Sequence, residues 1–198
     1  MNRIVRPRFA CSGCEAFTQA VLPSRPIERG RPGPGLLAHV LVNKYADHLP
    51  LYRQSGIFER DGIDIDRSTL AGWAGQAASL LDPIVSRIRE EGLKAAKIHT
   101  DDTPVPCLVP GKGKTAQARL WTHVVDDRAS GSTGPALVWY KFTLDRSGIH
   151  PQTELKTFTG LLQADGYAGY DKLYQDGRIR EVACWAHFRR KIFENHLS

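Results

Sequence analysis

Apolar residues recur at helical spacing through the first third of the chain. Between residues 35 and 60 they return every three or four positions, at Leu36, Leu37, Val40, Leu41, Tyr45, Leu49, Leu51 and Tyr52. This spacing places them on one face of an α-helix. Pro50 interrupts the pattern, because proline lacks the amide hydrogen that a helix interior needs. We therefore predict two helices, at 35–47 and 50–60, followed by a turn at Asp61-Gly62.

A second helical pattern follows this turn. Its inward face is supplied by Leu70, Trp73, Ala74 and Ala77. Asp66 or Ser68 can cap its N-terminus, and the segment 63–73 has the form of the turn and second helix of a helix-turn-helix. Arg67, Ser68 and Thr69 then lie where such helices meet DNA, the alternative being a plain helical bundle. A further helix at 80–92 is expected to end at Gly92, a C-terminal cap signal.

Strand-like segments dominate the chain from residue 95 onward. They lie at 96–101, 119–126, 136–144, 161–167 and 182–185, with helical segments at 151–160, 169–175 and from His187 onward. Thr103-Pro104 is expected to end the first of these strands. The order β-β-β-α-β-α-β-α is the topology of the RNase H-like fold.

The predicted fold class is therefore α/β (α+β), with an RNase H-like mixed sheet that is truncated at its C-terminal end. A small helical, helix-turn-helix-like domain and half a zinc ribbon precede this sheet. The expected boundaries are 1–34 for the zinc-ribbon remnant and linker, 35–94 for the helical domain and 95–198 for the incomplete catalytic core.

Two carboxylates stand at the ends of the first and fourth predicted strands. Asp101 ends the first and Asp165 the fourth, and in an RNase H-like sheet these strands lie side by side. Paired carboxylates bind hard divalent cations such as Mg²⁺ or Mn²⁺, and such ions support in-line phosphodiester transfer. Each aspartate taken alone also fits an ordinary turn. The presence of both aspartates at the two expected strand ends favours a catalytic role.

A third carboxylate normally completes such a site. The later acidic residues are Asp171, Asp176, Glu181 and Glu194. The third acid of this fold usually lies on a later helix, and the chain stops as that helix begins. The sequence therefore does not assign a third acid.

The first 34 residues are rich in Arg and Pro and contain a C-x-x-C motif. Cys11 and Cys14 flank Ser12-Gly13, the turn in which two thiolates reach one Zn²⁺. Four ligands are needed and no second C-x-x-C exists, so this is a candidate half of a zinc site, or an unmetallated remnant. The Pro- and Gly-dense stretch 23–34 is expected to be a linker.

The formal net charge of +6 suits a polyanionic partner, double-stranded DNA first. A merely basic protein is the alternative. No apolar run is long enough to span a membrane, and no secretory signal is present. A cytoplasmic, nucleoid-associated protein without a membrane partner is the expectation.

Several long motifs resemble the insertion sequence 66 family of transposases. They are the run Gly35–Trp73, His99–Val105, Leu162–Tyr170 and Cys184–Lys191, and together they cover nearly the whole chain. The resemblance implies a transposase with an RNase H-like core that cuts and joins the ends of its element with an acidic triad and Mg²⁺. It also implies the terminal repeats as the DNA partner, oligomer formation at full length, and accessory proteins of the same element.

The resemblance also implies individual roles. Asp101 takes the position of the first acid and Asp165 that of the second, while Asp102 stands where family members often have Glu. Cys184 and His187 match a C-x-x-H motif whose role is structural or ligand-binding. The choice between Asp101 and Asp102 as first acid stays open.

The sequence departs from the family pattern at two places. One of two cysteine pairs is present, and the downstream Glu that supplies the third acid is absent. We therefore expect a fragment, truncated at both ends, that retains DNA binding but cannot complete strand transfer alone. The alternatives are an RNase H-like nuclease of another type, with Asp171, Glu181 or Glu194 as the third ligand, and a non-enzymatic DNA-binding regulator.

Overall fold

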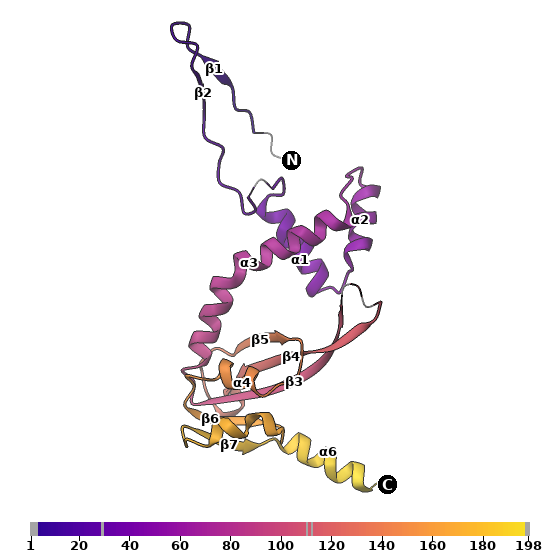
Figure 1. Cartoon of the computed structure of the whole chain (residues 1–198), viewed down its shortest axis with the longest axis vertical. Helices are drawn as coiled ribbons and strands as arrows, with labels where there is room; N and C mark the ends of the chain where they lie inside the picture. Colours follow the sequence, from indigo (N-terminus) through magenta and orange to yellow (C-terminus); the bar gives the residue numbers. More distant parts are fainter. Residues whose placement is uncertain (1–3, 29, 110, 112, 197–198) are drawn as a thin grey trace. The chain divides into compact units, whose positions relative to one another are not determined.

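The computed structural model describes residues 4–28, 30–109, 111 and 113–196. The chain divides into two compact units, Met1–Asp82 and Pro83–Ser198, which are described one at a time (Figure 1). None of the helices in the described part combines the length and the apolar content that a membrane crossing requires.

The first unit begins with a small exposed hairpin. Strands β1 (Arg8–Ala10) and β2 (Phe17–Gln19) pair antiparallel, and Cys11 and Cys14 lie in the turn between them (Figure 1). Every residue of the two strands is exposed. The hairpin therefore has no apolar core of its own.

Two short helices follow, close to the predicted positions. Helix α1 (Pro34–Tyr45) begins at a proline, whose fixed φ suits the first helical turn, and α2 (Leu51–Arg60) begins after Pro50. Val40, Phe58 and Leu70 form the core that these helices share with the start of α3. The buried amide of Gln54 donates to the carbonyls of Val40 (3.3 Å) and Leu49 (3.0 Å), which ties the two helices together.

The next helix is longer than predicted. Two helices were expected, but α3 runs without interruption from Arg67 to Gly92 and includes Pro83. A proline inside a helix removes one hydrogen bond and costs about 3 kcal/mol. Strong helix formers on the N-terminal side of Pro83, among them Ala77, Ala78, Leu80 and Leu81, explain why the helix continues.

The second unit is built on a five-stranded mixed sheet. Its strands are β3 (Lys97–Leu108), β4 (Thr115–Val125), β5 (Leu137–Thr143), β6 (Gly160–Ala164) and β7 (Ile179–Ala183). The spatial order is β5-β4-β3-β6-β7 (Figure 1). The first three strands are antiparallel, whereas β6 is parallel to β3 and β7. This topology confirms the predicted α+β class and RNase H-like strand order.

Strand β3 does not end at Thr103-Pro104 as predicted, but continues to Leu108. The amide of Asp102 donates to Asp101 Oδ1 instead of to β4. Strand alternation places the nitrogens of Pro104 and Pro106 on the same side as this amide. Strand β6 pairs only with residues 97–99 on that side, so the missing proline donors cost no ladder hydrogen bond.

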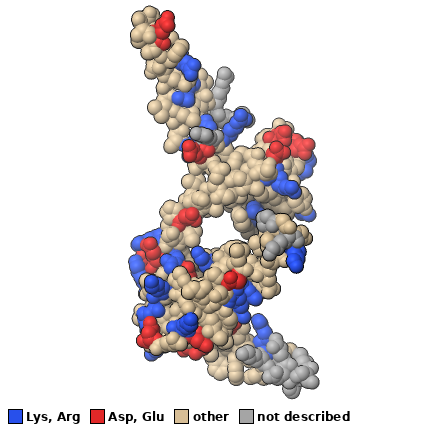
Figure 2. Space-filling model, viewed as in Figure 1, with Lys and Arg blue, Asp and Glu red and all other residues tan. Residues whose placement is uncertain are grey.

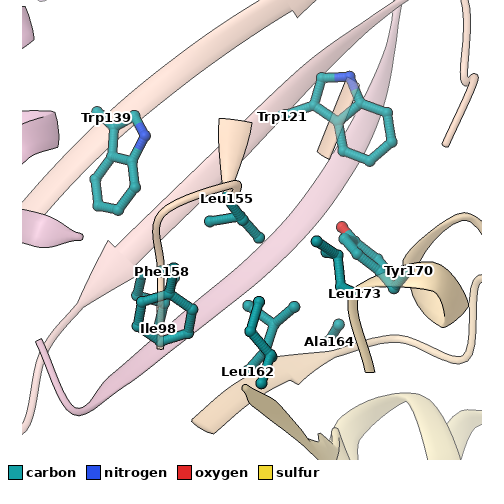
Figure 3. Packing of buried hydrophobic residues seen from close by; sticks show 10 residues of the cluster. Ile98, Trp121, Trp139, Leu155, Phe158, Leu162, Ala164, Tyr170 and Leu173 are labelled. Carbon is teal, nitrogen blue, oxygen red and sulfur yellow. The ribbon is translucent and has the colours of Figure 1, made fainter. Parts of the chain in front are cut away.

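Short helices contribute buried residues to the core, which also contains side chains of the sheet (Figure 3). They are α4 (Ile149–Glu154), η2 (Ala168–Tyr170) and α5 (Asp171–Tyr174), while α6 (Trp185–His196) follows β7. The core contains Ile98, Trp121, Trp139, Leu155, Phe158, Leu162, Ala164, Tyr170, Leu173 and Ile179. Both buried indoles have partners: Trp121 donates to Thr143 Oγ1 (2.8 Å) and Trp139 to Glu154 Oε1 (3.1 Å). A buried indole N–H needs such an acceptor.

Gly92 ends α3 as predicted, but for a different reason. Its φ is not positive, so it is not the left-handed cap that the sequence suggested. A Cβ atom here would lie 2.4 Å from Cζ3 of Trp139. Glycine is required because the helix end passes directly over a buried indole.

Candidate active site

Three carboxylates gather where β3 and β6 part. His99 pairs with Gln163 in the last parallel pair, so continuation of the register sets Asp101 beside Asp165. Asp165 directly follows β6. One carboxylate oxygen each from Asp101, Asp102 and Asp165 lies within 4.8 Å of the others. The structure thus brings together the two acids that the sequence paired, and their catalytic role stays a prediction.

Asp101 and Asp102 point to different environments, because neighbouring residues of a strand face opposite ways. Asp101 is exposed, and its Oδ1 accepts the amide of Asp102 (2.8 Å). The side chain of Asp102 is fully buried, although its backbone leaves the residue as a whole half-buried. One acid is therefore open to a ligand while the other is enclosed.

Two arginines neutralise the buried Asp102. Arg119 Nη1 lies 3.0 Å from Oδ2. Arg146 Nε lies 2.9 Å from Oδ1 and 3.1 Å from Oδ2, and its Nη2 lies 2.8 Å from Oδ1. Both oxygens of Asp102 thus accept charge-assisted hydrogen bonds, which are about twice as strong as neutral ones. This carboxylate is already satisfied by protein cations.

Arg146 also reaches the second acid. Its Nη2 lies 3.2 Å from Asp165 Oδ2, and its guanidinium stacks on Tyr167 at 4.1 Å from the ring centre. Burial works against the charge of Arg146, but hydrogen bonding and attraction by Asp102, then attraction by Asp165, outweigh it and raise its pKa. Sequence reasoning missed Arg146, which lies in the loop after β5 and carries no periodic or motif signal.

A buried polar chain lies beneath the acids. Thr100 Oγ1 is 3.0 Å from His123 Nδ1 and 3.4 Å from the hydroxyl of Tyr170. His123 stacks on Trp139 with 5.0 Å between ring centres, and burial lowers its pKa to about 4. Burial raises the pKa of Tyr170. Both side chains are therefore uncharged near neutral pH.

A cavity of about 450 Å³ adjoins Asp165. Its other lining residues are Arg146, Gly166, Tyr167, Ala168, His187 and Arg190. His187 is the histidine of the C-x-x-H motif, and its Nδ1 is buried without a hydrogen-bond partner among the described residues. The backbone amide of His187 is the main cause that lowers the pKa of the Cys184 thiol. The motif thus lies next to the acid cluster, which the sequence did not indicate.

The other acidic candidates do not join this cluster. Among the described residues, the three carboxylates named above are the group close enough to share an ion, and Asp171, Asp176 and Glu181 are not part of it. Asp176 instead pairs with Arg178 at 3.3 Å. The side chain of Glu194 lies outside the described residues. The cluster of Asp101, Asp102 and Asp165 offers carboxylate oxygens, and Asp101 is exposed. Such oxygens are suitable ligands for a hard divalent cation.

The two other predicted sites lie in the first unit. Cys11 and Cys14 are both exposed, and the amides of Gly13 and Cys14, followed by the Cys14 side chain, lower the pKa of the Cys11 thiol. A lowered pKa favours the thiolate that binds metal. Arg67, Ser68 and Thr69 form the exposed first turn of α3.

Known proteins resemble almost the entire chain. Residues 29–198 match the family described as "Transposase IS66 family". The uncharacterized protein y4qI of Sinorhizobium fredii is 40% identical over 200 residues, which cover 98% of this chain and 37% of that protein. The uncharacterized protein y4hP of the same organism is 40% identical over 194 residues, covering 96% and 35%. The chain thus spans somewhat more than a third of the length of these curated relatives.

Proposed function

We propose, from the premise that this chain belongs to the IS66 family of transposases, that it carries two acids of a metal-dependent phosphodiester-transfer site. The observation that supports this most directly is the convergence of Asp101 and Asp165 from adjacent parallel strands. Two carboxylates on a rigid sheet edge are a suitable support for Mg²⁺ or Mn²⁺.

Asp101, not Asp102, is the first metal ligand in this proposal. Asp102 is enclosed and hydrogen-bonded at both oxygens by Arg119 and Arg146, whereas Asp101 is exposed. A bound ion would activate the attacking water or 3′-hydroxyl. Asp102 holds its two arginines in place beside the acids.

The chain itself supplies groups suited to DNA phosphates. Arg146, Arg190 and His187 line the cavity beside Asp165, and arginine guanidinium groups recognise phosphate oxygens. On the face drawn in Figure 2, Lys and Arg side chains are interspersed with Asp and Glu instead of forming one continuous patch. The cavity is therefore a more specific argument for phosphate binding than the net charge.

Complete transposition needs more than this cluster. No further carboxylate joins Asp101, Asp102 and Asp165 among the described residues. We infer that the third acid lies outside these three residues. The 198-residue chain by itself then binds a divalent ion without joining DNA ends. Oligomer formation and accessory proteins belong to the same proposal.

Metal binding tests the proposed site. Mn²⁺ binding to the purified chain would be measured by electron paramagnetic resonance, which reports the free ion. Asp165→Asn and Asp101→Asn are expected to weaken binding at least tenfold. Asp171→Asn is the control, since Asp171 is exposed on α5 and outside the cluster. Equal affinities in all three variants would contradict the site.

The DNA-binding regulator remains the second candidate, because the first turn of α3 is exposed and lies on a separate unit from the acids. Arg67→Ala is expected to weaken duplex binding and reduce its salt dependence by about one counterion. Arg87→Ala is a control, since Arg87 already pairs with Glu91. Binding that needs Arg67 in a chain that binds no Mn²⁺ would favour a regulator over an enzyme.

A further inference from the structure

We propose that Arg146 is a metal-responsive latch on the acid cluster. In this structure its guanidinium joins Asp102 to Asp165, and it must release Asp165 before a divalent ion can bind there. This inference rests on the proposed metal site at Asp101 and Asp165, and it assigns a positioning role to a residue that no sequence motif marks.

The two ends of the bridge are unequal. Arg146 makes three contacts of 2.8–3.1 Å with Asp102, but a single contact of 3.2 Å with Asp165. A two-pronged arginine–carboxylate pair is stronger and more directional than a single contact. When an ion competes for the cluster, the bond to Asp165 is therefore the one that breaks.

The competition concerns one particular oxygen. The amide of Tyr167 donates to Asp165 Oδ1 (3.3 Å), whereas Arg146 occupies Oδ2. Both carboxylate oxygens of Asp165 therefore already accept a hydrogen bond, Oδ1 from a backbone amide and Oδ2 from a positively charged side chain. The guanidinium thus opposes the ion both by occupying a ligand atom and by charge repulsion.

The surroundings restrict Arg146 to a small movement. Its guanidinium stacks on Tyr167, and the Tyr167 hydroxyl donates to the carbonyl of Arg146. The side chain is still 37% exposed, and it lines the cavity that also contains His187 and Arg190. After Asp165 is released, Nη2 keeps its contact with Asp102 Oδ1, and its second N–H can donate to a DNA phosphate bound in this cavity. Metal binding and phosphate binding are thereby coupled through one side chain.

Variants at Arg146 test the latch through metal affinity, without any measurement of catalysis. Arg146→Lys keeps the charge, but a lysine ammonium lacks the planar fork that joins two carboxylates. Arg146→Gln removes the charge as well. Arg119→Gln is the matched control, because Arg119 neutralises Asp102 (3.0 Å) and is not bonded to Asp165. Circular dichroism confirms that each variant is folded.

We expect the Mn²⁺ dissociation constant, measured by electron paramagnetic resonance, to fall about tenfold in both Arg146 variants and less than threefold in Arg119→Gln. Unchanged or weaker binding in Arg146→Lys and Arg146→Gln overturns the latch while leaving the metal site in place. An equal gain in Arg119→Gln also overturns it, since overall charge would then explain the effect. Absence of Mn²⁺ binding in the parent chain and in Arg146→Gln overturns both the latch and the proposed metal site.

Discussion

Replacing Asp102 by Asn separates the structural acid from the metal-binding acid. The substitution preserves the shape of the side chain but removes its charge. The Asn carbonyl can accept from one arginine, whereas its NH₂ group faces the other arginine and cannot accept a hydrogen bond. Arg119 and Arg146 then remain beside a site that no longer neutralises them.

The expected cost follows from burial. Removing one partner of a buried ion pair costs about 3–5 kcal/mol. Asp102 has a 0% exposed side chain, but Arg119 is 19% and Arg146 37% exposed, so water takes over part of the solvation. We therefore expect a loss of about 2–3 kcal/mol in the free energy of unfolding. Such a loss lowers the urea midpoint by about 1–2 M.

The assay is urea denaturation monitored by tryptophan fluorescence, since Trp121 and Trp139 are buried in the same unit. Asp101→Asn is the paired variant. Asp101 is exposed, so its replacement is expected to change stability by less than about 0.5 kcal/mol while abolishing most Mn²⁺ binding. Asp102→Asn is expected to lower the free energy of unfolding as stated above while leaving most Mn²⁺ binding intact.

The opposite pattern would refute the assignment. If Asp102→Asn left the urea midpoint unchanged and abolished Mn²⁺ binding, Asp102 would be the first metal ligand. The arginine pairing would then not describe its role in the metal-bound protein.

Three further predictions concern other parts of the chain. Gly92→Ala places a methyl group against Trp139 and should cost about 1–3 kcal/mol in urea denaturation, whereas Gly75→Ala, with no neighbour within 4 Å, should gain up to about 1 kcal/mol. Burial lowers the pKa of His123 from 6.5 to about 4. As the pH falls, the imidazole therefore takes up a proton in the unfolded chain before it does so in the folded protein. The stability it contributes is full above pH 6.5 and falls by up to about 3 kcal/mol towards pH 4; a His123→Asn variant with the same pH profile would contradict this. Cys11→Ser should abolish zinc binding in a chelator-release assay, and zinc retained by that variant would exclude the half-site.

The apolar pattern and strand order predicted much of the fold. Helices α1 and α2 lie close to their predicted positions, because a helical face repeats every three to four residues and proline marks its interruption. The paired strands β3 and β6 also followed from element order. Local pattern could not show that Pro104 lies within a strand. That outcome depends on whether a neighbouring strand needs the amide hydrogen that proline lacks.

The candidate site divides in the same way. The sequence by itself determined that Asp101 and Asp165 are candidate partners, since each follows an apolar strand-like run and the strand order sets those strands side by side. Only the tertiary structure decided which of Asp101 and Asp102 is open to a ligand, because that depends on Arg146, which lies 44 residues from Asp102 along the chain. A loop side chain has no periodicity that fixes its direction. Its contacts, and with them the charge of the acid cluster, are set only when the sheet and its loops have folded together.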